Sequence, residues 1–205
     1  MSGEGAKAVV LAAGMGRRFG GGKLHAFYRG KPLLSYVLDV VGAARQRGLI
    51  DGGHVVIAAG DDRAAMLVEA AGLERAVNDA PELGLSHSLG LGLAAIQATS
   101  DAGAALIFLG DQPLVRVEVV QAVIERWRAD DGDIIRPRYH STPAAPGHPA
   151  LLTRAVWQAQ GRLQGDQGFA SLPGVSSFRT ALVDVPGDNP DIDTLADLVG
   201  LEESS

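Results

Sequence analysis

The feature that most constrains this chain is a glycine-rich, basic loop that directly follows a short apolar run near the N-terminus. The apolar run covers residues 8–13, and its length suits a strand buried on both faces, as in a parallel sheet. Glycines let backbone N–H groups approach phosphate oxygens, and basic side chains offset the charge of the phosphates. The sequence therefore predicts a strand followed by a polyphosphate-binding loop, whose glycines and cations are Gly14, Gly16, Gly20, Gly21, Gly22, Arg17, Arg18 and Lys23.

Known phosphate-binding patterns narrow the interpretation of this loop only in part. The loop is not a Walker motif, because no Gly-Lys-Ser/Thr follows at the required spacing. A partial dinucleotide fingerprint, Gly14-x-Gly16-x-x-x-Gly20, is one residue longer than the usual form. An NAD(P)H-dependent oxidoreductase, with Asp61 near the end of the second main strand as its ribose ligand, thus remains an alternative. An exposed turn after a buried strand is the plain structural alternative.

Strand and helix patterns alternate along the rest of the chain. We expect strands at 8–13, 54–59, 74–77, 104–109, 133–138, 148–152 and 178–185, and helices at 32–41, 63–71, 86–97, 117–129, 153–158 and 194–198. Such alternation is typical of an α/β fold with three layers, in which helices cover both faces of a mainly parallel, Rossmann-like sheet.

Length and composition favour one domain over residues 1–205. The part after about residue 130 is less regular and short for a core of its own, so we expect an N-terminal part at about 6–130 and a C-terminal elaboration at about 131–200. The formal net charge of −6 disfavours nucleic acid and anionic membranes as partners. The chain has no cysteine, and neither a signal peptide nor a membrane-spanning stretch is recognisable, so we expect a cytoplasmic protein.

A second chemical motif, Gly110-Asp111-Gln112-Pro113, follows the predicted strand at 104–109. Ligands of open α/β sheets bind at the carboxyl ends of the strands, which is where Asp111 falls. A carboxylate there suits Mg²⁺, which keeps most of its waters and bridges to substrate phosphates. An Asp-x-Pro turn without a metal role is the alternative for this motif taken alone.

Together the two motifs point to a family. The N-terminal arrangement L-A-A-G-x-G-x-R-x-G-x-x-K resembles the signature loop of MobA/MocA-like NTP transferases, which have a nucleotide-diphospho-sugar transferase-like fold. Further segments match in the same order, namely Asn78 with 84–93, then 147–149, 165–168 and 191–194. The resemblance is most specific to molybdenum cofactor cytidylyltransferases, although Leu195 stands where that family usually has proline.

The resemblance implies the residues of the site. It implies catalytic roles for Arg18, Lys23 and Asp111. It also implies that Asp111 binds Mg²⁺, with Asp193 or Asp191 as a possible second ligand. The acceptor contacts implied are Gly147, His148, Pro149 and Asp166. The nucleotide contacts implied are Leu11, Ala12, Ala13, Gly14, Gly16, Arg18, Lys23, Asn78, Ser86 and Ser88. Two structural alternatives stay open: Ser86 caps its own helix, and Asp193 or Thr194 opens the last one.

The resemblance also implies the reaction. CMP would pass from CTP to the terminal phosphate of molybdopterin with release of pyrophosphate, and a molybdoenzyme or its chaperone could receive the product. The base assignment depends largely on Ala13, since the GTP-using branch usually has glycine there. A GTP-using enzyme, another small-phosphate acceptor, and a nucleotide or cofactor-binding protein without turnover remain alternatives.

Overall fold

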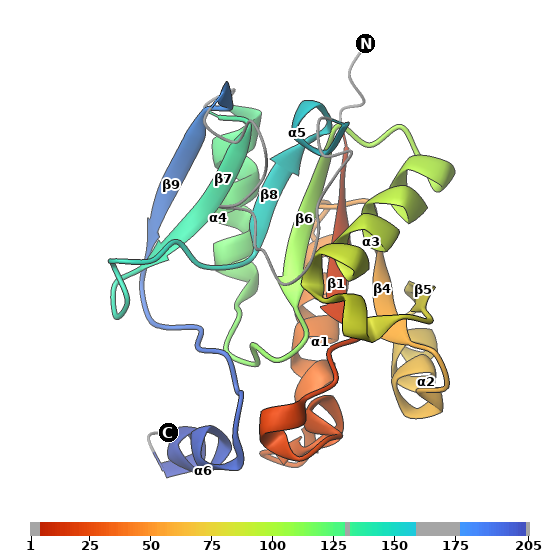
Figure 1. Cartoon of the computed structure of the whole chain (residues 1–205). Coiled ribbons are helices and arrows are strands. Elements are labelled where there is room, and N and C mark those ends of the chain that lie inside the picture. The colour runs from red at the N-terminus through yellow and green to blue at the C-terminus, as the bar shows by residue number, and fades with distance from the viewer. Residues whose placement is uncertain (1–4, 130–131, 159–176, 204–205) are drawn as a thin grey trace.

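The computed structural model describes residues 5–129, 132–158 and 177–203, and its centre is a seven-stranded sheet (Figure 1). The strand order is β5-β4-β1-β6-β8-β7-β9. Six strands are mutually parallel, and β8 alone runs antiparallel to its neighbours β6 and β7. The bounds are β1 (Ala6–Ala12), β4 (Gly53–Ala58), β5 (Glu74–Asn78), β6 (Ala104–Leu109), β7 (Ile134–Tyr139), β8 (Ala150–Thr153) and β9 (Thr180–Val185).

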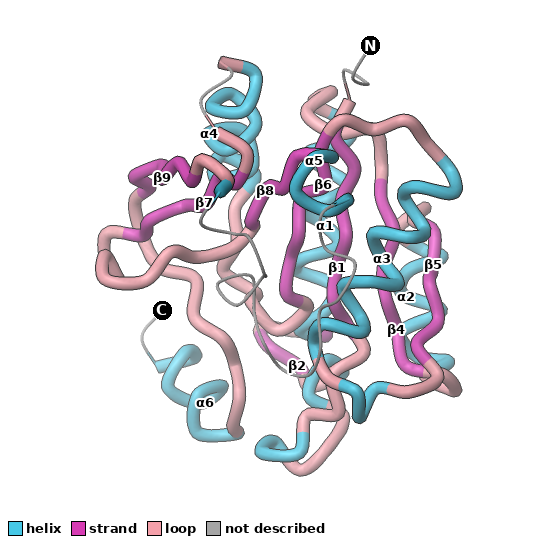
Figure 2. Tube along the Cα trace, turned by 45° about the horizontal axis from the view of Figure 1, so that its top comes forward, coloured by secondary structure: helices cyan, strands magenta, loops and turns pink. Residues whose placement is uncertain are grey.

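Helices cover both faces of this sheet, which Figure 2 shows from a tilted view. On one face lie α1 (Leu33–Gln46), α2 (Asp62–Ala70) and α4 (Val117–Arg128), whose apolar side chains pack against the strands in one core. On the other lie α3 (Leu85–Thr99) and α5 (Arg154–Gln158), which form a second core. The predicted three-layer, mainly parallel architecture is therefore confirmed.

The buried strand β1 explains how the two cores meet. Successive side chains of a strand point to opposite faces, so Val10 packs in the α1 core while Val9 and Leu11 pack in the α3 core. Helix α3 approaches β1 so closely that a Cβ on Gly92 would lie 2.4 Å from a methyl carbon of Val9. This close approach requires glycine in the middle of a helix.

Several elements were not expected from the sequence. The loop after β1 contains 3₁₀ turns at Arg17–Phe19 and Lys23–His25, followed by a short hairpin of β2 (Phe27–Tyr28) and β3 (Lys31–Pro32).

The last helix, α6 (Leu195–Glu203), is longer than the predicted 194–198. It packs through Leu198 against Tyr28 and Leu33, so α6 and the N-terminal loop lie at the same end of the sheet (Figure 1). Among the helices that the structure describes, none has the length and apolar character of a transmembrane span.

Candidate functional site

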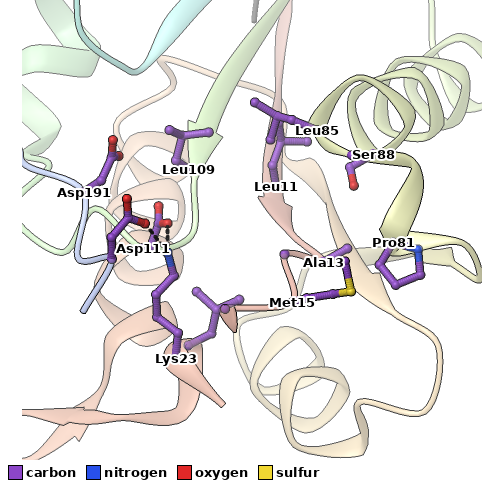
Figure 3. A pocket seen from close by; sticks show the side chains of 15 residues that line it. Leu11, Ala13, Met15, Lys23, Pro81, Leu85, Ser88, Leu109, Asp111 and Asp191 are labelled. Carbon is purple, nitrogen blue, oxygen red and sulfur yellow. Dashed lines mark hydrogen bonds and ion pairs between the residues drawn. The ribbon is translucent and has the colours of Figure 1, made fainter. Parts of the chain in front are cut away.

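A pocket of about 300 Å³ lies at the carboxyl ends of β1 and β6, beside the start of α3 (Figure 3). This is the edge at which open α/β sheets bind ligands. One side of the pocket is charged and the other is mainly apolar. Its lining consists of Leu11, Ala13, Gly14, Met15, Gly16, Lys23, Leu24, Pro81, Gly84, Leu85, Ser88, Leu109, Asp111, Asp191 and Asp193.

The charged side is centred on the Lys23 ammonium, which lies between two carboxylates. Lys23 Nζ is 2.5 Å from Asp111 Oδ2 and 3.0 Å from Asp193 Oδ1. Figure 3 shows the lysine pointing at Asp111. Burial by itself would lower the pKa of Lys23, but the Asp111 and Asp193 carboxylates outweigh it and leave the pKa raised. The lysine is therefore a fixed positive charge on the pocket wall. A second cation, the largely exposed Arg18, reaches Asp193 at 3.5 Å.

The loop conformation brings Lys23 to this position. Gly16 has φ +55°, a left-handed conformation that other residues rarely adopt, and a Cβ there would lie 3.1 Å from Lys23 Cβ. The turn Lys23–His25 then begins directly after Gly22. Glycine is thus required where the loop folds back on the lysine.

The three aspartates of the charged side come from two distant segments. The Ile192 N–H donates to the Asp111 carbonyl oxygen at 3.1 Å, which holds residues 191–193 beside the end of β6. Partial burial and the nearby Asp111 carboxylate raise the pKa of Asp191, and Gln112 Nε2 donates to its Oδ1 at 2.8 Å. Asp111 and Asp193 therefore pair with Lys23, Asp193 also reaches Arg18, and Asp191 lies beside them in the pocket lining.

This donor set fits a hard divalent cation that is bound mainly through substrate. Within the described ranges, no group of three or more acidic, histidine or cysteine side chains is arranged as a protein cage for a metal. Mg²⁺ is commonly held by one or two carboxylates together with waters and substrate phosphates. Asp111 and Asp193, whose oxygens already surround one cationic group, are suited to that role.

The apolar side of the pocket carries one oriented hydroxyl. The Ala80 N–H donates to Asn78 Oδ1 at 2.9 Å, so the amide nitrogen of Asn78 faces Ser88 Oγ and donates to it, also at 2.9 Å. Ser88 therefore accepts from Asn78 and can donate its own proton to a ligand in the pocket that it lines. Met15, Pro81 and other apolar side chains lie around this hydroxyl in Figure 3.

Some residues proposed for the nucleotide do not line the pocket. Ala12 alternates with its neighbours along β1 and packs in the core on the α1 face. Asn78 is fully buried and reaches the pocket lining through its hydrogen bond to Ser88. Ser86 is buried in the first turn of α3, whose N-cap is Gly84, so the alternative in which Ser86 caps this helix is wrong. The glycine before the helix, Gly84, occupies the N-cap position instead.

The two alternatives for the C-terminal aspartates are separated by the structure. Thr194 Oγ1 accepts from the Asp197 N–H at 3.2 Å, and the Asp197 carboxylate accepts from the Thr194 N–H at 2.7 Å, which is a reciprocal cap of α6. Asp193 instead turns its carboxylate to Lys23. Thr194 therefore caps α6, and its neighbour Asp193 pairs with the Lys23 ammonium.

The segment Gly147-His148-Pro149, proposed for the acceptor, lies outside the pocket lining but at the same edge of the sheet, just before β8. The His148 carbonyl oxygen accepts from the Tyr139 hydroxyl at 2.7 Å and from Asn189 Nδ2 at 3.3 Å. Burial, with a contribution from Arg136, lowers the pKa of His148 to about 3, so its imidazole is neutral. Asp166, the other proposed acceptor contact, lies outside the described residues.

The sequence analysis missed several residues of this region. Met15 and Pro81 belong to the apolar side, yet each stands in a loop or first helical turn where no periodic pattern marks it. Leu85 also lines the pocket and lies within the matched segment 84–93, although it was not named as a contact. The buried amides Gln112 and Asn189 were also missed. Gln112 sits inside the Gly-Asp-Gln-Pro motif, which was a usable signal, whereas nothing in the sequence singles out Asn189.

Asp61, the possible ribose ligand of a dinucleotide site, is engaged elsewhere. Its Oδ1 accepts from the Ala64 N–H at 3.0 Å and caps α2. Both of its oxygens lie 2.9 Å from His25 Nε2. Its partners therefore give it a structural role between the N-terminal loop and α2, which removes the main residue of the oxidoreductase alternative.

Comparison with known proteins gives a family match over most of the chain. The model of the MobA-like NTP transferase domain matches residues 8–195. A probable molybdenum cofactor guanylyltransferase of Thermococcus gammatolerans is 30% identical over 145 residues, which are 69% of this chain and 67% of that protein. The bifunctional protein GlmU of Rhizorhabdus wittichii is 35% identical over 133 residues, 62% of this chain. The match spans only 27% of GlmU.

Solved structures agree with this match. The crystal structure of Rv0371c from Mycobacterium tuberculosis superposes with a TM-score of 0.76 at 31% identity and covers 99% of this chain and 100% of that one. A further structure of Rv0371c is a complex with manganese (TM-score 0.72, 30% identity, 98% and 100% coverage). CMP:2-keto-3-deoxy-manno-octonic acid synthetase with CTP has a TM-score of 0.74 at 16% identity and 98% coverage of both chains, which shows the shared fold alone.

Proposed function

The chain belongs to the MobA-like NTP transferase family, and on this basis we propose that it transfers CMP from CTP to the terminal phosphate of molybdopterin. An oxygen of the acceptor phosphate forms a bond to the α-phosphorus, the bond from the α-phosphorus to the bridging oxygen breaks, and pyrophosphate leaves. The acceptor is already an anion near neutral pH, so the step needs no strong general base. The main difficulty is to bring two anions together.

The observation that carries this proposal is the Lys23 ammonium held between Asp111 and Asp193 at one side of a pocket whose other side is apolar. The apolar side would take the base, and the glycine loop of residues 14–22 would follow the triphosphate. Lys23 and Arg18 then lie where negative charge grows on the leaving pyrophosphate. Preorganised charges of this kind are among the largest contributions to catalysis.

A divalent ion completes the charge balance of the proposed site. Asp111 would hold it, with Asp193 or Asp191 as the second ligand. When bound, Mg²⁺ would neutralise phosphate oxygens and withdraw charge from the reacting phosphorus. The residues of the chain bind and align the two substrates, and alignment alone can lower the barrier of such a reaction by about 7–11 kcal/mol.

GTP is the second candidate for the nucleotide. Ala13 lines the pocket and supports CTP through the sequence resemblance, whereas the Thermococcus relative is named as a guanylyltransferase. The Ser88 hydroxyl does not separate the two bases, because both cytosine and guanine offer acceptors to a donor. The acceptor assignment to 147–149 and Asp166, and a molybdoenzyme as the recipient of the product, belong to the same proposal.

Pyrophosphate release tests the proposal directly. The protein is incubated with each NTP in turn, Mg²⁺ and molybdopterin, and pyrophosphate and the dinucleotide product are measured. We expect release with CTP that depends on molybdopterin. Release only with GTP would mean that the nucleotide substrate is GTP and not CTP. Release only when another phosphomonoester is added in place of molybdopterin would mean that the acceptor is different. No release with any NTP would favour a binding protein. Thermal stabilisation by CTP, GTP and NADPH gives a first comparison, since ligand binding raises apparent stability.

A further inference from the structure

A chain of buried amides joins the Gly147–Pro149 segment to the charged side of the pocket. Asn189 Nδ2 lies 3.3 Å from the His148 carbonyl oxygen and 3.1 Å from Gln112 Oε1. Gln112 Nε2 lies 2.8 Å from Asp191 Oδ1. Gln112 is 6% exposed and Asn189 7%. Three segments that are distant in the sequence therefore form one hydrogen-bonded unit, which we call the amide bridge.

The order of donors and acceptors fixes the direction of the amide bridge. An ionised carboxylate only accepts hydrogen bonds, so Gln112 must turn its nitrogen to Asp191 and its oxygen to Asn189. Asn189 must then turn its nitrogen to Gln112, and the same nitrogen meets the His148 carbonyl, which is also an acceptor. Reversing either amide would place oxygen against oxygen. The bridge thus holds Oδ1 of Asp191, a residue that lines the pocket.

The amide bridge includes a polar atom whose burial lowers the stability of the fold. Asn189 Oδ1 is buried and has no hydrogen-bond partner among the residues that the structure describes. A buried polar atom without a partner costs stability, and apolar side chains of similar size avoid that cost. Stability alone therefore does not account for two buried amides at this place.

We propose that Gln112 and Asn189 are positioning residues that set the distance between the acceptor-binding segment and the carboxylates at the pocket. This inference rests on the proposed function, in which the acceptor phosphate must reach a phosphorus held at Asp111 and Lys23. Small misplacements of reacting groups reduce rates strongly. Neither amide lines the pocket, so we expect their loss to affect the acceptor more than nucleotide binding.

The test compares variants that break the amide bridge at each of its two members. Asn189→Leu and Gln112→Met keep side-chain volume but remove the hydrogen bonds. We expect each to raise the KM for molybdopterin at least fivefold and to lower kcat at least fivefold, with the Kd for CTP changed less than twofold. Because the two residues act as one unit, the double variant should be about as impaired as the worse single variant.

Thr99→Val is the matched control. It removes the hydroxyl that lies 3.0 Å from Nε2 of the buried His54, at the end of α3 far from the pocket. We expect wild-type KM, kcat and Kd. Unchanged molybdopterin KM and kcat in both bridge variants would overturn the inference, and so would an equal loss in Thr99→Val. Gln112→Met leaves Asn189 in place and keeps the test available if Asn189→Leu does not fold.

A second readout separates this inference from the proposed function. Amide hydrogen exchange of residues 140–149 needs no substrate, and we expect faster exchange in Asn189→Leu but not in Thr99→Val. If the wild-type protein does not use molybdopterin with any NTP, the proposed function fails while the exchange result still decides whether the bridge holds this segment. Exchange equal to the wild type in both bridge variants would overturn the inference.

Discussion

Replacing Lys23 by methionine removes the charge between the carboxylates and keeps most of the side-chain volume. The Lys23 side chain is 11% exposed and that of Asp111 is 20% exposed. Removing one partner of a fully buried ion pair costs about 3–5 kcal/mol, whereas exposed pairs contribute about 0–1 kcal/mol. For this intermediate case we expect Lys23→Met to lower the free energy of unfolding by about 2 kcal/mol without ligands. We expect kcat to fall at least about tenfold, because a cation at the leaving phosphates is lost.

The pH dependence of this stability difference follows from the raised pKa of Lys23. A lysine whose pKa is raised in the folded state contributes stability that is fully present below its ordinary value of 10.5 and is lost as the pH rises through the higher value. The difference between wild type and Lys23→Met should therefore stay constant from pH 7 to pH 9.5 and shrink above pH 10.5.

Urea denaturation at several pH values, together with steady-state pyrophosphate release, measures both effects. Lys31→Met is the matched control, because Lys31 pairs with Asp39 in an exposed ion pair in which both side chains are more than a third exposed. We expect it to cost about 1 kcal/mol or less and to leave turnover unchanged. A wild-type kcat in Lys23→Met, or a stability loss no larger than in Lys31→Met, would refute the role given to Lys23.

Three further predictions concern the pocket and the acceptor segment. Asp111→Asn should lower turnover at least about 100-fold by weakening metal binding; a fully active variant would place the metal elsewhere. Ser88→Ala should raise the KM for the nucleotide about fivefold with little change in kcat, since one hydrogen bond is worth about 1 kcal/mol; an unchanged KM would mean that Ser88 does not contact the nucleotide. The pKa of His148, about 3 in the folded protein, lies below its ordinary value of 6.5, so its stabilisation is present above pH 6.5 and is lost as the pH falls toward 3. Between pH 7.5 and 5 the wild type should therefore lose about 1–2 kcal/mol more stability than His148→Asn in urea denaturation, and parallel losses would contradict this.

The order and type of the main elements could be predicted from the sequence because the buried strands form apolar runs between helical patterns. The strand at 104–109 was expected with its observed bounds, and the helix at 117–129 ends one residue earlier. The β2–β3 hairpin was not expected, since its strands are two residues long and a pattern needs more repeats. The antiparallel direction of β8 depends on contacts made after a loop, which local periodicity does not report.

The candidate site was predicted where backbone chemistry leaves a mark in the sequence. Glycines and cations marked the loop that carries Lys23, and a carboxylate at a strand end marked Asp111. Ala12 was predicted to contact the nucleotide but packs in the core on the α1 face. A run of small apolar residues does not show which face of the sheet each side chain takes. The amide bridge depends on tertiary contacts between Gln112 and Asn189, 77 positions apart, and no local pattern predicts such a contact.

A crystal structure with a non-hydrolysable CTP analogue and Mn²⁺, located by its anomalous scattering, tests the central claim most directly. The account predicts the triphosphate along residues 14–23, Lys23 in contact with it, and the ion beside Asp111. Phosphates bound away from this loop, or an ion remote from Asp111, would contradict it.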